Sequence, residues 1–219
     1  MNQVVRRLAP RTLPDQIAEW LIAEVSEERL EPGQRITEQF VAEQYEVSRG
    51  PVRDAFRIVE KLGLIKLLPR KGAVVSPLDP VELQELFAIR AALSRVAIGR
   101  VVENASDEQL TELVGNAREL RSLVDDADTF FAASNVISED FLTLACSHKL
   151  SELLRPLHIQ IMRYRHHGFS SLAARNASAL GFVEIAEAMK TRDKGRALDV
   201  LEAMTGVLQS EIERVIGSS

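Results

Sequence analysis

The segment from Arg49 to Lys61 constrains the fold more than any other part of the chain. Basic residues occupy every fourth position, and apolar residues recur between them at helical spacing. Residues four apart share one face of a helix, so the pattern predicts an amphipathic helix with one basic and one apolar face. Ser48 is suited to cap the start of this helix, and Gly63 to stop it. The basic residues are Arg49, Arg53, Arg57 and Lys61.

Two further helices are predicted before this one. Pro14 suits the first turn of a helix of about four turns, because its missing N–H would have no partner there. After the turn at residues 30–34, Thr37 is predicted to cap a short second helix. In that helix, Phe40, Val41 and Tyr45 are expected to face a core.

Two short extended runs, residues 64–68 and 73–76, follow the basic helix and flank Pro69-Arg-Lys-Gly72. They predict a β-hairpin with a basic tip. Helix, short helix, helix and hairpin is the order of a winged helix-turn-helix, in which the last helix enters the major groove of DNA. The alternative for the basic face alone is a solvated surface.

Charge is distributed unevenly over the chain, whose formal net charge is −5. Residues 1–78 carry 12 Lys and Arg against 11 Asp and Glu, whereas residues 79–219 carry 15 against 21. The turn-rich stretch from Ser76 to Pro80 separates them, so we expect a DNA-binding domain at 1–78 and a second domain at 79–219. The single cysteine, Cys146, lies in an apolar run and is expected to be buried.

The apolar runs are too short to span a membrane, and residues 1–11 lack the apolar core of a signal peptide. We therefore expect a cytoplasmic protein without a membrane partner. With 46% apolar and 27% charged residues, the chain is expected to fold into packed domains.

The first domain resembles the DNA-binding domain of the GntR family over about residues 13–77. The resemblance rests on Leu30-Glu-Pro-Gly-Gln-Arg-Ile-Thr-Glu, on Val41-Ala-Glu-Gln-Tyr-Glu-Val-Ser-Arg-Gly-Pro-Val-Arg-Asp-Ala-Phe, on Gly63-Leu and on Arg70-Lys-Gly-Ala-Val-Val. It implies a homodimer on a short palindrome of double-stranded operator DNA. Gln39 stands where some relatives have a basic DNA contact. The residues expected to contact DNA are Ser48, Arg49, Gly50, Arg53, Arg57, Arg70, Lys71 and Gly72.

The second domain is predicted to be all helical. Asp79-Pro-Val-Glu82 and Ser106-Asp-Glu-Gln109 resemble capping boxes at two helix starts. Further helices are expected at about 127–147, 149–167, 180–190 and 193–216. The sequence contains no nucleotide-binding glycine loop, nucleophile elbow or His-Glu-x-x-His motif, so an enzyme is not supported and no cofactor is expected. The fold class is mainly α, with one small hairpin.

The second domain is similar to the FadR-type ligand-binding domain of the same family. Many such domains hold a divalent metal with one Asp and three His. The corresponding positions here are Asn135, Glu139, Phe182 and Met204, which form a poor donor set, and no His occurs in 168–219. No metal site is therefore expected.

The resemblance places Arg90 where relatives have an arginine that reaches the ligand cavity. We therefore expect an anionic effector, such as a carboxylate or an acyl thioester; a salt bridge at a helix interface is the alternative. Asn135 and Glu139 share a helix face and are either polar walls of the cavity or exposed. The residues expected to bind the effector are Arg90, Asn135, Glu139, Arg163, Phe182 and Met204.

The sequence thus predicts a transcriptional regulator whose affinity for operator DNA is changed by a small molecule in the second domain. Two other classes remain open. One is an architectural DNA-binding dimer that has lost its effector, and the other is a helical metal-dependent enzyme fused to a winged helix.

Overall fold

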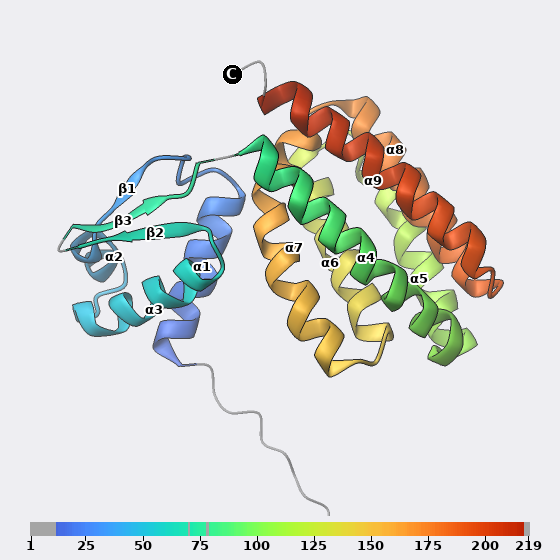
Figure 1. The fold of residues 1–219 in the computed structure, drawn as a ribbon, viewed down its shortest axis with the longest axis horizontal. Coiled ribbons are helices and arrows are strands. Elements are labelled where there is room, and N and C mark those ends of the chain that lie inside the picture. Colours follow the sequence, from blue (N-terminus) through green and yellow to red (C-terminus); the bar gives the residue numbers. More distant parts are fainter. Residues whose placement is uncertain (1–11, 70, 78, 217–219) are drawn as a thin grey trace, which may run out of the picture. The chain divides into compact units, whose positions relative to one another are not determined.

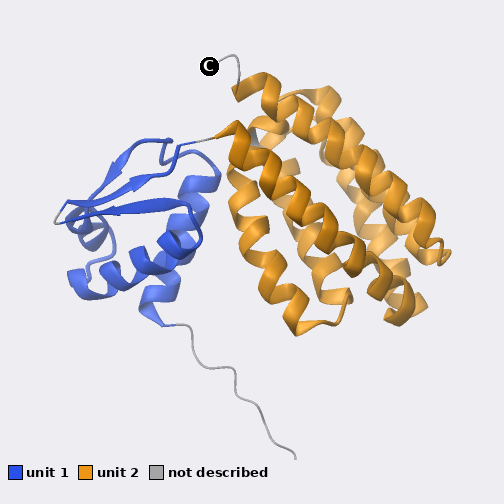
Figure 2. Ribbon diagram, in the orientation of Figure 1, with its two compact units in different colours: residues 1–77 blue, residues 78–219 orange. Residues whose placement is uncertain are grey.

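The computed structural model describes residues 12–69, 71–77 and 79–216 of the chain. It divides into two compact units, residues 1–77 and 78–219 (Figure 2). The predicted fold class is confirmed, because nearly all regular structure is helical and the one small sheet lies in the first unit. Within the described ranges, no helix is long and apolar enough to cross a membrane.

The first unit contains three helices and three short strands in its described part (Figure 1). Helix α1 begins with a capping box in which Thr12 and Asp15 bond each other's backbone N–H, and Pro14 lies in its first turn. The elements are α1 (Leu13–Ser26), β1 (Arg35–Ile36), α2 (Glu38–Gln44), α3 (Arg49–Lys61), β2 (Ile65–Leu68) and β3 (Gly72–Val75).

Helices α1 and α3 pack together to form the core of the first unit. The apolar face of α3 is buried as its spacing predicts, and the helix stops before Gly63, whose φ is +74°. Phe40 was expected in the core, but its side chain is 45% exposed. Seven residues make only two turns, and the core contacts of α2 are supplied by Val41 and Ala42 instead. The buried apolar residues of α3 are Val52, Ala55, Phe56 and Val59.

The sheet has the strand order β1-β3-β2, and both pairings are antiparallel. The hairpin of β2 and β3 was predicted, whereas β1 was not, because two residues are too few to show alternation. Gly72 begins β3 with a φ of +83°. A Cβ atom there would lie 2.2 Å from the carbonyl oxygen of Ile36, so the close approach of β1 excludes a side chain.

The second unit is a bundle of helices (Figure 1). The short 3₁₀ helix η1 follows α5 in the chain. In the described part of the chain, every helix of the bundle contributes apolar residues to its core. The elements are α4 (Pro80–Asn104), α5 (Asp107–Glu119), η1 (Leu120–Leu123), α6 (Ala127–Leu144), α7 (His148–Gly168), α8 (Leu172–Lys190) and α9 (Lys194–Ile216).

Three details of the bundle differ from the prediction. Helix α8 begins at Leu172 rather than near 180, because Ser171 caps it and the alanine-rich segment that follows favours a helix. Helix α6 ends at Leu144, and Cys146, expected to be buried, is exposed in the link to α7 with a φ of +47°. Asp79 caps α4 through the N–H of Val81, but Glu82 does not complete a capping box.

Candidate functional site

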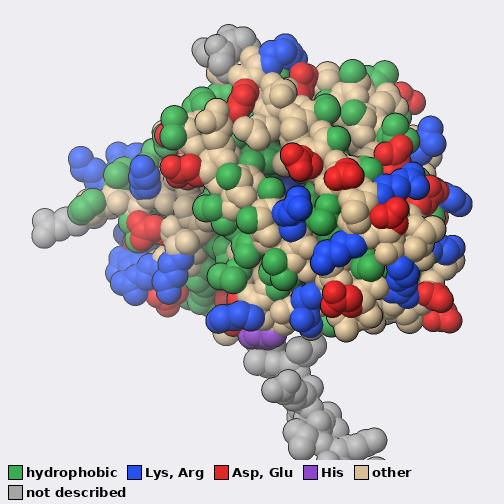
Figure 3. Space-filling model, turned by 45° about the vertical axis from the view of Figure 1, so that its right-hand side comes forward, with side chains coloured by type: hydrophobic (Ala, Val, Ile, Leu, Met, Phe, Trp, Pro, Cys, Tyr) green, Lys and Arg blue, Asp and Glu red, His purple; other side chains and the backbone are tan. Residues whose placement is uncertain are grey.

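The basic face of α3 is exposed over its whole length. The side chains of Arg53 and Arg57 are 57% and 63% exposed, and Arg49 and Lys61 are exposed as well. In Figure 3, Lys and Arg side chains gather on the first unit, whereas acidic and basic side chains are intermixed over the second. An exposed helix with four cations on one face matches the charge of a DNA backbone and the width of its major groove.

Side chains of α2 orient two of these arginines. The guanidinium of Arg53 donates two hydrogen bonds to the carboxylate of Glu38, at 2.9 and 2.8 Å. This bidentate pair lowers the pKa of Glu38. Arg49 donates to the amide oxygen of Gln39 at 3.1 Å. Gln39 stands where some relatives have a basic DNA contact, and here it positions Arg49 of α3 instead.

The remaining first-unit residues predicted to contact DNA lie at the start of α3 and at the hairpin. Ser48 is the N-cap residue of α3, but its side chain makes no capping hydrogen bond, so its exposed hydroxyl is free of that role. Gly50 is exposed beside it. Lys71 is exposed, and its carbonyl accepts a hydrogen bond from Arg35 at 3.0 Å, which holds the hairpin tip. Arg70 lies outside the described residues.

The second unit encloses a cavity of about 60 Å³ between its helices. Arg90, Phe182 and Met204, three of the residues predicted to bind an effector, line it together with apolar side chains. A smaller cavity of about 20 Å³ shares these three residues and Leu201 as walls, and Arg165 lines it. The three predicted residues therefore lie together at the boundary between two neighbouring cavities.

The other three predicted effector residues do not line either cavity. Asn135 accepts a hydrogen bond from Arg165 at 2.8 Å. Glu139 forms an ion pair with Arg155 at 3.0 Å, and its side chain is 35% exposed. Arg163 is bonded to Glu82. Of these three, Asn135 contacts a cavity-lining residue, because it accepts a hydrogen bond from Arg165 of the smaller cavity.

The residues at the positions of the family's metal ligands do not fit a divalent cation. Phe182 is buried and stacks on Phe141, with ring centroids 6.4 Å apart. The oxygen of Asn135 already accepts from a guanidinium, beside which a second cation would be repelled. Within the part of the chain that the structure describes, no three His, Cys, Asp or Glu side chains are grouped as metal ligands.

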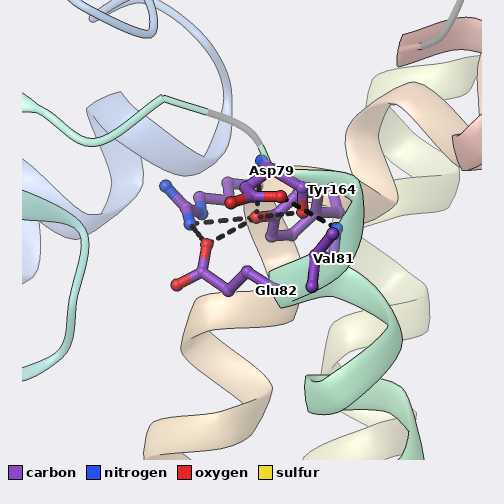
Figure 4. Close-up of polar contacts among 5 residues, drawn as sticks. Asp79, Val81, Glu82 and Tyr164 are labelled. Carbon is purple, nitrogen blue, oxygen red and sulfur yellow. Dashed lines mark hydrogen bonds and ion pairs between the residues drawn. The ribbon is translucent and has the colours of Figure 1, made fainter.

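A polar network holds the beginning of α4 against α7 (Figure 4). The hydroxyl of Tyr164 donates to Glu82 at 2.7 Å and accepts from the backbone N–H of Asp79 at 3.2 Å. Arg163 donates to both Glu82, at 2.5 Å, and the hydroxyl of Tyr164, at 3.1 Å. Burial raises the pKa of Tyr164 to about 12, so its phenol stays protonated and can donate.

Two buried polar residues at the cavities, His158 and Arg165, were not predicted as site residues. Both lie on α7, and a signal for them exists in the spacing of Leu154, His158, Ile161 and Arg165, which places all four on one buried face. The same spacing leaves Arg163 on a different face. The periodicity of α7 therefore distinguishes the two neighbouring arginines once the helix boundaries are known.

Comparisons with known proteins agree with this arrangement of units. Residues 13–75 match the family model described as bacterial regulatory proteins, gntR family, and residues 85–206 match that of the FCD domain. The chain is 26% identical over 216 residues to the transcriptional repressor RspR of Escherichia coli, covering 98% of this chain and 90% of that protein.

Two other similarities differ in extent. The HTH-type transcriptional regulator YdhC of Bacillus subtilis is 32% identical over 123 residues, which span 56% of this chain and half the length of that protein. The solved structure of E. coli McbR/YncC has a TM-score of 0.81 at 21% identity and covers 95% of this chain and 99% of its own, which shows a shared fold. The chain therefore belongs to the GntR family of bacterial transcriptional regulators and carries an FCD domain as its second unit.

Proposed function

We propose that this GntR-family regulator binds a short palindromic operator as a homodimer, and that a small anionic metabolite in the FCD domain changes its affinity for that DNA. The basic face of α3 carries the DNA half of the proposal. Arg49 and Arg53 are exposed, project from a helix that fits the major groove, and are held in place by Gln39 and Glu38. Reading a palindrome symmetrically requires two copies of this helix.

The position of Arg90 carries the effector half. Its side chain lines a cavity whose other walls are mostly apolar. Burial lowers the pKa of Arg90 to about 10, so the guanidinium is charged at neutral pH. A buried charge is stable only with a partner, and an anionic ligand supplies one.

Consecutive residues of α7 connect the effector to the linker. Arg165 lines a cavity, whereas Tyr164 and Arg163 bond to Asp79 and Glu82 at the start of α4. Helix α4 follows directly on the segment that joins the two units. A ligand that shifts this part of α7 also shifts the start of α4, and the change in DNA affinity equals the ligand's preference between the two arrangements.

The proposal is tested by DNA-binding titrations of the full chain. A duplex selected from a random library serves as the operator, and a scrambled duplex as the reference. Arg49→Ala and Arg53→Ala should each weaken operator binding by about 1–3 kcal/mol. Circular dichroism should show an intact fold, because both side chains are exposed.

Arg29→Ala is the matched control. Arg29 is an exposed arginine of the same unit that is not part of α3 and that pairs with Glu24 and Glu27. It should bind the operator like the wild type. Operator affinity that is unchanged in both α3 variants would show that the basic face is only a solvated surface.

A further inference from the structure

We infer that Arg165 is a second ligand-binding residue, and that Arg90 and Arg165 together form a two-guanidinium site that holds the carboxylate of a small organic acid without a metal ion. The inference rests on the proposed ligand-controlled function and names the ligand's class and its second anchor. Three observations support it. The arginines of the bundle differ in their hydrogen-bond and ion-pair partners, Arg90 and Arg165 line neighbouring cavities, and the buried His158 lines one of these cavities.

Four arginines in the second unit differ in their hydrogen-bond and ion-pair partners, and this difference distinguishes structural arginines from those we assign to ligand binding. Arg163 is neutralised by Glu82, and Arg175 donates three hydrogen bonds to the carbonyls of Val124, Phe169 and Ser170. Arg165 is 2% exposed. In the described structure its guanidinium donates to the neutral side chains of Asn135 and Ser134 and lies over the ring of Phe169, and its Nε has no acceptor. Arg90 makes no hydrogen bond or ion pair within the described part of the chain.

Two positive charges therefore lie close to each other without a carboxylate, that of Arg165 buried and that of Arg90 partly buried. Both side chains line the smaller cavity, and none of the residues that line either cavity is Asp or Glu. Burial, and after it the proximity of Arg90, lowers the pKa of Arg165 to about 9, which still leaves both groups charged at pH 7. Uncompensated buried charges destabilise a fold, so this arrangement fits a site completed by an anion.

His158 provides a third polar group at the same place. It is 3% exposed, lines the larger cavity, and its Nδ1 has no hydrogen-bond partner in the described structure. Burial and the charges of Arg90, Arg165 and Arg155 lower the pKa of His158 well below its usual value, so the imidazole is neutral. A neutral imidazole adds a hydrogen bond to a ligand without adding a third charge.

The remaining walls define the rest of the ligand. The larger cavity is lined mainly by apolar side chains, among them Ile98, Phe141, Leu154 and Phe182. Such walls favour a short aliphatic or aromatic body over a polyhydroxylated one. Two guanidinium groups are suited to the planar, bidentate carboxylate group. The ligand class is therefore a small organic acid with an apolar body.

Thermal unfolding of the full chain tests this inference. Benzoate, butyrate, succinate and inorganic phosphate serve as probes at constant ionic strength, with benzamide as the neutral analogue of benzoate. At a concentration 100 times its dissociation constant, a bound carboxylate should raise the melting temperature by about 5 to 11 °C. Benzamide should not, and phosphate should raise it less than the best carboxylate.

Charge-removing variants give the second readout. Without any probe, Arg90→Met should melt at or above the wild-type temperature, because it removes an unpaired, partly buried charge beside Arg165. Arg175→Met, the matched control, should melt several degrees lower because three backbone carbonyls lose their donor. The carboxylate-induced rise should disappear in both Arg90→Met and Arg165→Met and persist in Arg155→Gln.

The inference is wrong if no carboxylate stabilises the wild type more than Arg90→Met, or if Arg165→Met keeps the full carboxylate-induced rise. It is also wrong if Arg90→Met destabilises the probe-free protein as much as Arg175→Met does. Each of these three outcomes leaves operator binding and its loss in Arg53→Ala intact. Failure of the proposed function appears instead as operator binding that Arg53→Ala does not weaken, whatever the anions do.

Discussion

At the scale of single residues, Gly72 is required both by its backbone conformation and by a tertiary contact. Its φ of +83° lies in the left-handed region, and the carbonyl of Ile36 occupies the space that a Cβ would need. Gly33 has a similar φ of +81° but no neighbour within 4 Å of its missing Cβ. A side chain at Gly33 would therefore meet only an unfavourable φ, whereas a side chain at Gly72 would also collide with β1.

We expect Gly33→Ala to destabilise the first unit by about 1–2 kcal/mol through strain alone. Gly72→Ala should cost more, because β1 must also move away from β3. Urea unfolding followed by the fluorescence of Trp20 measures both, since Trp20 is the single tryptophan and packs on Tyr45 in this unit. Equal costs for the two variants would contradict the close approach of β1.

His158 predicts a pH dependence of stability. Its pKa in the folded chain is well below the usual 6.5, so the unfolded chain takes up a proton that the folded chain does not as pH falls. Stability is therefore lost on acidification through about pH 6.5, by about 1.4 kcal/mol between pH 7.5 and 5.5. His158→Gln should lose correspondingly less over this interval in urea unfolding followed by circular dichroism.

His148→Gln is the control for this experiment, because His148 is exposed at the start of α7. It should show the wild-type pH dependence. A wild-type slope that also persists in His158→Gln would mean that other groups cause the acid sensitivity.

At the scale of elements, three consecutive residues of α7 contact both a cavity and the start of α4. Arg165 faces a cavity, while Arg163 and Tyr164 hold the first turn of α4. Successive residues of a helix point in different directions, so one rigid segment contacts both places. We therefore expect α7 to be the element through which ligand binding reaches the linker.

We expect Tyr164→Phe to separate ligand binding from its effect on DNA. The variant removes the hydroxyl that bonds Glu82 and the backbone of Asp79, but it leaves Arg165 in place. The carboxylate-induced rise in melting temperature should persist, whereas the carboxylate-induced change in operator affinity should shrink. Lys149→Gln, an exposed position on α7, should keep both effects, and an unchanged DNA response in Tyr164→Phe would exclude this connection.

At the scale of the whole molecule, the net charge of −5 does not show how charge is distributed between the two units. The acidic excess belongs to residues 79–219, whereas the exposed face of α3 presents four cations. Long-range repulsion between DNA and the acidic unit is screened within about 8 Å at physiological salt, so we expect contacts at α3 to decide binding. Bulk charge therefore says little about this protein's affinity for DNA.

The dependence of operator binding on salt should accordingly be that of a basic surface. If a dimer neutralises about six to ten phosphates, affinity should fall by about 10³- to 10⁵-fold between 50 and 200 mM salt. Each copy of Lys61→Gln should reduce the slope of log affinity against log salt without changing operator preference. Fluorescence anisotropy at several salt concentrations measures this, and a flat response would contradict phosphate contacts.

Much of the fold follows from local patterns. The capping signals at Thr37 and Ser106, the stop at Gly63 and the spacing of apolar residues in α3 lie within a few residues of the structures they specify. The start of α8 was misplaced because alanine-rich turns show little apolar contrast between faces. Strand β1 was missed because its two residues become a strand only by pairing with Val74 and Ala73.

The sequence by itself determined the order of the α-helices, the basic face of α3 and the arginine on α4, because periodicity and charge are properties of neighbouring residues. Only the tertiary structure decided which cations are already paired. Arg163 and Arg165 lie two residues apart and are both buried, yet packing gives one a carboxylate and the other a cavity. Whether a buried charge has a partner depends on residues up to 81 positions away, and no local pattern records that distance.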